Sequence, residues 1–201
     1  MRRLILTLMA LSATAFAFDR QNDAPRFDYQ GYFQFQRSSL SIGSSCILSW
    51  HRVGIELEHE EGDPFEEFAA TMVGGSTLEY SFYRVKGVFR LPLNRSWNCR
   101  FSAGYGGGTS TASFDTGILP LVMAIGLGYQ WDGMKYSYSE HVRSGTMKVS
   151  LEKQFFRIFK AELIGGVTYY SFSDGIKQIR TVDNWTPTLA LALGVRTPWG
   201  Q

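Results

Sequence analysis

The sequence predicts an all-β protein: an antiparallel, up-and-down transmembrane β-barrel of eight strands, or of ten if two weaker segments also form strands. Apolar and polar residues alternate through most of the chain after residue 26, which is the period of a strand and not of a helix. The alternating segments are about 9–11 residues long, which is the length that crosses a bilayer as a tilted strand. In a membrane barrel the apolar face contacts lipid and the polar face lines the lumen.

The N-terminal segment, residues 1–17, is predicted to be an export signal. Two arginines follow Met1, an apolar core comes next, and an Ala-Phe-Ala cleavage site ends the segment. The apolar core is too short to cross a membrane as a helix, which takes about 20 residues. We therefore expect a mature chain that begins at Phe18 and forms a single barrel domain, residues 18–201.

Composition limits the classes of protein that fit. The 201 residues suit one domain, and the net charge of +2 is too small to indicate a nucleic-acid partner. The mean hydropathy of -0.12 excludes a helical membrane protein. It does not exclude a membrane barrel, because only alternate residues of each barrel strand need be apolar.

The first part of the mature chain contains one clear strand and several less regular segments. Phe27–Gln36 places aromatic residues on one face and amide and acidic residues on the other. Residues 38–45 are predicted to be a serine-rich connection, with a candidate short strand near Leu40. A longer strand is expected over residues 46–59, followed by a long acidic loop. Residues 68–73 are a second candidate for a short strand.

The clearest hairpin follows, with its first strand from Leu78 to Leu91 and its second from Trp97 to Tyr105. Proline, asparagine and serine between the two strands are typical of a short turn. The alternation changes phase between Phe82 and Tyr83, which predicts a β-bulge. One face of this hairpin carries several cations, a pattern that fits either a solvated surface or the lumen of a barrel.

The rest of the chain continues the alternation. Glycine, serine and threonine dominate residues 106–119, which predicts a loop, and Phe172–Trp185 is predicted to be a polar loop. Ser144 and Gly145 are expected to form a turn between two strands. The predicted strands are Leu121–Trp131, Lys135–Val142, Met147–Glu152, Phe159–Tyr169 and Thr188–Arg196.

With the apolar faces toward lipid, the opposite faces bring charged residues into the lumen. Side chains are enough to fill the interior of a small barrel. Seven cations against four anions are costly to bury unless they pair and hold water, so we expect a plugged, ion-paired interior and not an open pore. Asp28 and Glu79 improve the balance if they also face inward. The predicted lumen network is Arg52, Glu56, Glu58, Arg84, Lys86, Arg90, Arg100, Lys148, Glu152, Lys160 and Glu162.

Aromatic residues near strand ends predict the interfacial girdles of a membrane barrel. They are Trp50, Trp97, Trp131, Tyr169 and Trp185. A soluble barrel is the alternative, in which the charges form a solvated surface and the aromatic faces form a core or line a cavity, as in a lipocalin-like barrel. That alternative predicts that the face of Phe27, Phe33 and Phe35 points inward.

Together these features resemble the small bacterial outer-membrane barrels of the OmpA, OmpX and OmpW type. The resemblance rests on the export signal, the amphipathic meander, the short turns that alternate with longer polar loops, and the internal arginine–glutamate pairs. It covers nearly all of the mature chain and implies a monomer in the bacterial outer membrane, in contact with outer-membrane lipid and with the barrel assembly machinery. The chain departs from the terminal aromatic residue common in such proteins, since Trp199 lies two residues from the end.

Candidate chemistry is sparse. His59 lies among glutamates, but no second histidine or cysteine stands at metal-ligand spacing, so we expect no metal site. Glu140, His141 and Ser144 have the residue types of a nucleophilic hydrolase site, yet alternation places His141 and Ser144 on opposite faces. We therefore expect no catalytic residues and no cofactor.

The two cysteines, Cys46 and Cys99, are permitted to form a disulfide in an oxidising periplasm. Alternation assigns Cys99 to the lipid-facing set and Cys46 to the lumen set, on strands that are not neighbours. A bridge requires Cα atoms within about 7 Å, so this placement favours two separate thiols.

The sequence therefore predicts a non-enzymatic outer-membrane barrel with a structural or surface-interaction role and no nucleic-acid partner. Three alternatives stay open. The first is a lipid-modifying outer-membrane hydrolase. The second is a narrow pore for small solutes, which requires a continuous water path past Arg84, Arg90 and Arg100. The third is a soluble periplasmic barrel that binds an apolar ligand.

Overall fold

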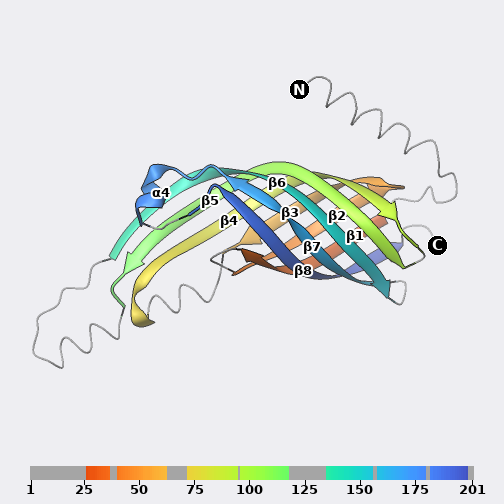
Figure 1. Cartoon of the computed structure of the whole chain (residues 1–201), viewed down its shortest axis with the longest axis horizontal. Coiled ribbons are helices and arrows are strands. Elements are labelled where there is room, and N and C mark those ends of the chain that lie inside the picture. Colours follow the sequence, from red (N-terminus) through yellow and green to blue (C-terminus); the bar gives the residue numbers. More distant parts are fainter. Residues whose placement is uncertain are drawn as a thin grey trace, which may run out of the picture.

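Eight antiparallel strands form a closed barrel in which each strand pairs with its neighbours in sequence and β8 pairs with β1 (Figure 1). The computed structural model describes residues 26–36, 40–62, 72–94, 96–117, 135–155, 158–179 and 182–198. The elements are β1 (Arg26–Gln36), β2 (Leu40–Trp50), β3 (Val53–Glu61), β4 (Gly75–Pro92), β5 (Trp97–Asp115), β6 (Lys135–Phe155), β7 (Phe159–Tyr170), α4 (Asp174–Ile179) and β8 (Trp185–Pro198). The prediction of an up-and-down barrel of eight strands is confirmed.

Across the described residues, no helix has both the length and the apolar character needed to span a membrane.

The two ends of the barrel differ in the lengths of their connections. β1 begins at Arg26 and β8 ends at Pro198 at the same end, which we call the turn end. The connections at that end are short and comprise residues 51–52, 93–96 and 156–158. At the opposite end, which we call the loop end, the β1–β2 connection, residues 37–39, is also short, but the other three, residues 62–74, 116–134 and 171–184, are longer, and α4 lies in the last of them (Figure 1). Outer-membrane barrels have short periplasmic turns and longer extracellular loops, so by the resemblance drawn above the loop end is expected to face the outside.

Three strands are much longer than the others. β4, β5 and β6 have 18, 19 and 21 residues, whereas the next longest, β8, has 14. The extra residues continue past the loop-end rim as a three-stranded sheet, which we call the arm (Figure 1). α4 contacts β5 and β6 of this sheet.

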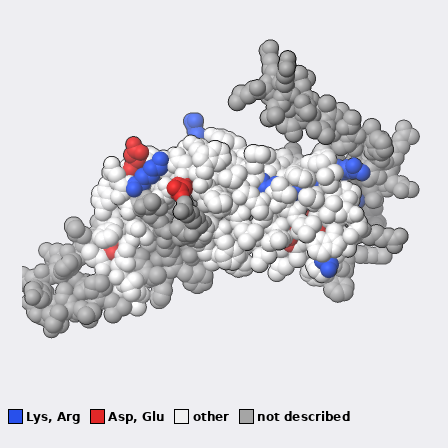
Figure 2. All heavy atoms as spheres, viewed as in Figure 1, with Lys and Arg blue, Asp and Glu red and all other residues white. Residues whose placement is uncertain are grey.

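The barrel is apolar outside and polar inside. On β1, Phe33 and Phe35 are 57% and 50% exposed, whereas Asp28 and Gln34 are fully buried. Phe27 is half-buried and shares the outward face with Phe33 and Phe35. In the view of Figure 2, most of the flank of the barrel is free of charged side chains. The inward-facing phenylalanine face that a soluble barrel requires is therefore absent from β1.

The faces of β4 exchange polarity where the strand enters the arm. Its outward residues change from apolar Val85 to polar Ser81, while its inward residues change from charged Arg84 to apolar Phe82. The pairing of β4 with β5 nevertheless continues from Gly75 to Pro92 without a break in register. The predicted β-bulge is therefore wrong: the strand is regular, and its polarity changes because it leaves the apolar belt of the barrel.

The same row of residues explains two other corrections. Tyr83 of β4 pairs with Gly107 of β5, and Gly107 pairs with Arg143 of β6. β5 continues through this row to Asp115, so residues 106–115 form a strand and not the predicted loop. β6 also continues through it, so the turn predicted at Ser144 and the following glycine is wrong. Beyond this row the outward residues no longer form the apolar belt, and the inward residues Phe82, Ala112 and Val142 are apolar and buried, so the pattern of the barrel strands does not continue.

β2 and β3 replace the single strand predicted over residues 46–59. A turn at His51, whose φ is 52°, separates the two strands. No glycine, proline, asparagine or aspartate marks this turn, which removes the usual sequence signal. Residues 40–45 of the predicted connection instead belong to β2, whereas Ser38 and Ser39 lie outside the described residues. Ser41 and Ser45 are buried and face the lumen, as does Ser49 farther along the same strand.

Several predicted features lie outside the described residues. They include residues 1–17, residues 68–71 of the second candidate short strand, and the predicted strand Leu121–Trp131. Met72 and Val73, which follow residues 68–71, are helical. β5 pairs directly with β6, so the ring of described strands closes without the segment between them.

Apolar side chains fill the lumen at the loop end. Phe82 and Tyr170 lie with their ring centroids 5.2 Å apart, and Tyr170 stacks on Phe172 at the same distance. Ile176 of α4 packs into this group and is fully buried. We call this cluster the aromatic plug; its buried members are Tyr80, Phe82, Ala112, Val142, Tyr170, Phe172 and Ile176.

Candidate functional site

Inward-facing residues form a charged network in the lumen on the turn-end side of the aromatic plug. Among the described residues, arginine and lysine supply seven buried cations, and aspartate and glutamate supply six buried anions. A buried charge is stable only when opposite charges and hydrogen-bonding groups surround it. The cations are Arg84, Lys86, Arg90, Arg100, Lys148, Lys160 and Arg196, and the anions are Asp28, Glu56, Glu58, Glu60, Glu152 and Glu162.

Glu60 of β3 occupies the part of the network next to the aromatic plug, where Tyr80 and Tyr170 of the plug donate hydrogen bonds to it. Its Oε2 atom pairs with the guanidinium group of Arg84 on β4. Its Oε1 atom accepts hydrogen bonds at 2.9 to 3.3 Å from donors on four strands. These donors are Gln34, Gln36, Ser41, Tyr80 and Tyr170. One carboxylate thereby connects β1, β2, β4 and β7 to β3 across the lumen.

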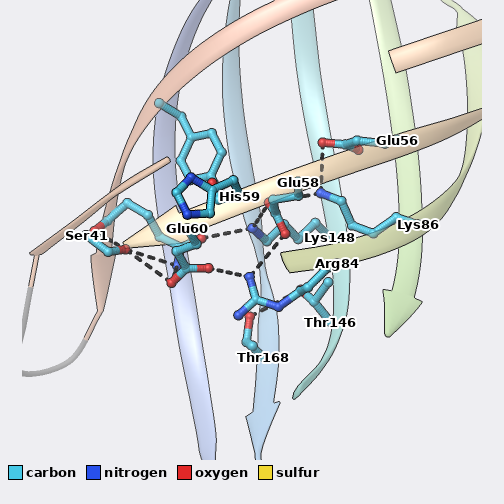
Figure 3. A network of polar contacts seen from close by, with 12 residues as sticks. Ser41, Glu56, Glu58, His59, Glu60, Arg84, Lys86, Thr146, Lys148 and Thr168 are labelled. Atoms are coloured by element: carbon cyan, nitrogen blue, oxygen red, sulfur yellow. Dashed lines mark hydrogen bonds and ion pairs between the residues drawn. The ribbon is translucent and has the colours of Figure 1, made fainter. Parts of the chain in front are cut away.

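Glu58 lies one inward position farther from the plug and is surrounded by cations (Figure 3). The Nζ atoms of Lys148 and Lys86 lie 2.8 and 3.0 Å from its Oε1 atom, and the Nη1 atom of Arg84 lies 3.2 Å from its Oε2 atom. Lys86 also lies 2.8 Å from Glu56, the next inward residue of β3. Cations of β4 and β6 therefore alternate with the carboxylates of β3.

Arg100 of β5 joins this group to the turn end of the network. Its Nε atom lies 2.8 Å from Glu162 on β7, and its Nη1 atom lies 3.4 Å from Glu56 on β3. The guanidinium group thus connects strands on opposite sides of the ring, which a single short side chain does not reach.

At the turn end, two carboxylates share three cations. Arg90 lies 2.7 Å from Asp28 and 3.3 Å from Glu152. Arg196 lies 2.8 Å from Asp28 and 2.6 Å from Glu152. Lys160 completes the group with Nζ 3.5 Å from each carboxylate. The strands β1, β4, β6, β7 and β8 meet in this group, which lies where the chain closes into a ring.

All but one of the predicted lumen residues lie in this network. The exception is Arg52, which lies in the turn between β2 and β3 and makes no ion pair with a residue that the structure describes. Its carbonyl oxygen instead accepts a hydrogen bond from the backbone NH of Arg90. A turn residue does not belong to either alternating face, so the period of two does not apply to it. Glu79 lies on the outward face of the arm and is exposed.

Glu60 and Arg196 were absent from the predicted network, and Asp28 was considered only as a possible addition. The signal for each is the same period of two that identifies the others. Glu60 continues the inward series of Glu56 and Glu58 on β3. Arg196 continues a series of small inward residues on β8, so its neighbours in sequence gave no charge pattern.

The candidate hydrolase residues are not brought together. His141 is exposed on the outward face of β6, whereas Ser144 is fully buried and accepts a hydrogen bond from Arg84. Glu140 faces inward and accepts a hydrogen bond at 2.8 Å from the backbone NH of Ser173. His59 also lies on an outward face, where it stacks on Tyr83.

The predicted interfacial aromatics separate into two levels. Trp50 and Trp97 lie at the turn end, where Lys153 covers the ring of Trp97. Tyr169 and Trp185 lie at the loop end with ring centroids 5.0 Å apart. Trp131 lies outside the described residues.

Cys46 and Cys99 are free thiols. Cys46 pairs with the exposed Tyr29 and Leu57, so it belongs to the lipid-facing set. Its assignment to the lumen set is wrong, because the His51 turn places it on β2 and not on the strand of the inward glutamates. The favoured outcome of two separate thiols is confirmed.

Comparisons with known proteins identify the fold. No protein-family model matches the chain, and no curated protein matches it. The chain is similar to a major outer membrane protein from Thermus thermophilus, with a TM-score of 0.65 and 8% identity over 87% of this chain and 100% of that chain. It is also similar to Neisserial surface protein A, with a TM-score of 0.50 and 10% identity over 87% of this chain and 96% of that chain. The chain therefore has the fold of the small bacterial outer-membrane β-barrels.

Proposed function

We propose that the protein is exported by its N-terminal segment, residues 1–17, and resides as a monomer in the bacterial outer membrane. There it has a structural or surface-interaction role and a closed lumen. The observation that carries this proposal is the reversed polarity of the barrel, which has an apolar outer belt and a charged interior. Insertion would bring the belt into contact with outer-membrane lipid and would require the barrel assembly machinery.

The packing of the barrel interior favours a closed lumen over a pore. A pore requires a water path past Arg84, Arg90 and Arg100, but each of these side chains is buried and paired with a carboxylate. The aromatic plug adds an apolar layer across the loop end. Two different kinds of packing therefore oppose the passage of ions.

The arm supports a role at the cell surface. It extends β4, β5 and β6 beyond the apolar belt on the side that carries the longer connections (Figure 1). Its outward residues are mostly hydroxyl-bearing, among them Thr109, Thr111 and Ser139. A polar sheet face outside the membrane is suited to contact with extracellular molecules or with the polar part of the membrane. The separation of His141 from Ser144 gives no support to the hydrolase alternative.

We expect Leu191→Arg to destabilise the protein by about 2–4 kcal/mol, the cost of an arginine at the midplane of a membrane barrel. Leu191 is 56% exposed on β8 and pairs with the exposed Phe33 and Leu163, in the middle of the apolar belt. The measurement is denaturant unfolding of the protein folded in phospholipid vesicles. Thr109→Arg is the matched control, because Thr109 is exposed on the arm outside the belt, and its effect is expected to stay within about 0.5 kcal/mol.

Equal stabilities of the Leu191 and Thr109 variants would contradict the membrane placement, since arginine on a water-exposed flank has no such cost. Recovery of the wild-type protein wholly in the soluble periplasmic fraction, with the same gel mobility before and after boiling, would contradict it independently.

We also expect the purified protein to give no steady single-channel conductance in a planar lipid bilayer. The ion pairs and the aromatic plug leave each candidate pore-lining arginine almost fully buried, with no more than 3% of its surface exposed. Discrete current steps whose amplitude scales with salt concentration would overturn the closed-lumen proposal. An empty bilayer treated with the same detergent is the control.

A further inference from the structure

An apolar groove crosses the outer surface of β5, β6, β7 and β8 at the loop-end edge of the belt. It has a volume of about 360 Å³. The side chains and backbone that line it include Ala103, Tyr105, Gly145, Met147, Tyr169 and Trp185. The groove therefore lies at the level where the outer leaflet of a membrane meets its polar region.

The groove exists because a glycine stands between two tyrosines. Tyr105 of β5, Gly145 of β6, Tyr169 of β7 and Trp185 of β8 are partners in one row across the four strands. Neighbouring strands lie about 4.8 Å apart, so the missing side chain at Gly145 leaves a channel between the two tyrosine rings. The channel runs along the strands, which cross the bilayer at a tilt, so an acyl chain in it would lie inclined between the two rings.

An unpaired cation stands directly above this channel. Arg143 lies two residues beyond Gly145 on the same face of β6, about 7 Å farther toward the outside. Its side chain is exposed and makes no ion pair with any residue that the structure describes, in contrast to the paired arginines of the lumen. Its β5 partner is Gly107, over which the imidazole of His141 lies, with Nε2 3.3 Å from the position of an added Cβ atom. Guanidinium groups bind phosphate oxygens through two parallel hydrogen bonds.

Hydroxyl groups continue the surface above Arg143. Thr109 and His141 are partners in the next row, and Thr111 and Ser139 follow, with their hydroxyl oxygens 3.0 Å apart. On β4, β5 and β6 the rows of Arg143 and Thr109 contain no carboxylate among the described residues, and Glu79 is the β4 partner of Thr111 in the row after them. The surface thus changes from apolar to cationic to hydroxyl-rich within a few rows of the same sheet.

We propose that this face binds a phosphorylated saccharolipid of the outer leaflet. One acyl chain lies against Gly145 between Tyr105 and Tyr169, a phosphate pairs with Arg143, and sugar hydroxyls contact the Thr109 and Ser139 rows. A second apolar groove, on β6, β7, β8 and β1, has no such cation among the described residues that line it, since its lysine, Lys160, is buried among lumen carboxylates. The combination of acyl channel and free arginine is what selects a phosphorylated lipid.

The test titrates lipid A carrying its phosphates onto the full-length protein folded in detergent and counts bound lipid by native mass spectrometry. We expect Arg143→Gln and Gly145→Val each to weaken binding by about tenfold, the effect of losing one charge-assisted contact or the acyl channel. Gly145→Val is expected to fold, because a Cβ atom there meets its nearest neighbours at 3.9 Å. Heat-dependent gel mobility verifies the folding of each variant.

Two matched controls separate the site from general effects. Lys177→Gln removes an exposed cation on α4, and Gly165→Val fills an outward glycine of β7 at which an added Cβ atom would have no neighbour within 4 Å. Both are expected to bind lipid A like the wild type. Lipid A without phosphates is expected to bind the wild type and Arg143→Gln equally.

Equal binding by all four variants would overturn the site, as would phosphatidylglycerol binding as tightly as lipid A. The inference rests on the proposed outer-membrane placement, but different experiments can overturn the lipid site and the placement. Leu191→Arg and membrane fractionation test the placement, whereas the variants of Arg143 and Gly145 test the site in detergent.

Discussion

We expect Gly108→Val to prevent the barrel from folding. Gly108 lies on β5 opposite Phe82 of β4. A Cβ atom at this position would overlap the carbonyl oxygen of Ser81 and lie 2.9 Å from the Cα atom of Phe82. Both are backbone atoms of the paired strand, so they cannot move without breaking the β4–β5 ladder. The cost therefore exceeds the roughly 1–3 kcal/mol of an overpacked side chain. The measurement is the fraction of protein that resists SDS until heated, which we expect to be lost.

Gly165→Val is the control for this prediction. Gly165 lies in the middle of β7 and pairs with the exposed residues Val149 and Leu189. No atom lies within 4 Å of a Cβ atom built there, and valine is well suited to a strand. Its folded fraction is expected to match that of the wild type. A Gly108→Val protein with an unchanged folded fraction would show that β5 does not approach β4 this closely.

The pattern of apolar and polar residues was sufficient to predict the barrel but not the path of every strand. The predicted bulge at Tyr83, the loop from Gly106 and the turn at Gly145 are three misinterpretations of one structural feature. Tyr83, Gly107 and Arg143 form a single row across β4, β5 and β6, at which all three strands leave the apolar belt. In the sequence these three interruptions of the alternation look unrelated. The strand pairing that places them in one row joins residues far apart in the chain, so the sequence pattern does not show it.

The number of strands was also correct for partly compensating reasons. Residues 46–59 contain two strands instead of one, because the turn at His51 has no proline or glycine signal. β6 is one strand instead of two. Local turn signals predict where a chain is free to reverse, whereas the closure of the ring decides where it does reverse.

The charged lumen was easier to predict than the boundaries of the strands. Residues such as Arg84 and Lys148 lie within regular alternation, so the face that holds them follows from their neighbours. The ion-pair partners across the lumen could not be predicted from the alternation. Arg100 pairs with Glu162 and Glu56 from strands that are not its neighbours, and those contacts depend on the diameter and stagger of the barrel.

We expect Glu60→Ala to lower the free energy of unfolding by about 3–5 kcal/mol, the range for breaking a buried ion pair from one side. The substitution leaves the guanidinium group of Arg84 with Glu58 as its remaining carboxylate partner. It also removes the common acceptor of hydrogen bonds from β1, β2, β4 and β7. The measurement is denaturant unfolding in phospholipid vesicles followed by tryptophan fluorescence.

Glu61→Ala is the matched control, because Glu61 is the next residue of the same strand but faces outward. Its side chain is 54% exposed and lies 3.5 Å from His59, so its loss is expected to change stability by no more than about 0.5 kcal/mol. The loss of stability from Glu60→Gln is expected to lie between the losses from Glu60→Ala and Glu61→Ala. The amide oxygen still accepts hydrogen bonds, but the charge that balances Arg84 is gone. Equal losses from Glu60→Ala and Glu61→Ala would mean that the lumen around Glu60 is open to water, because only water would compensate a buried arginine so completely.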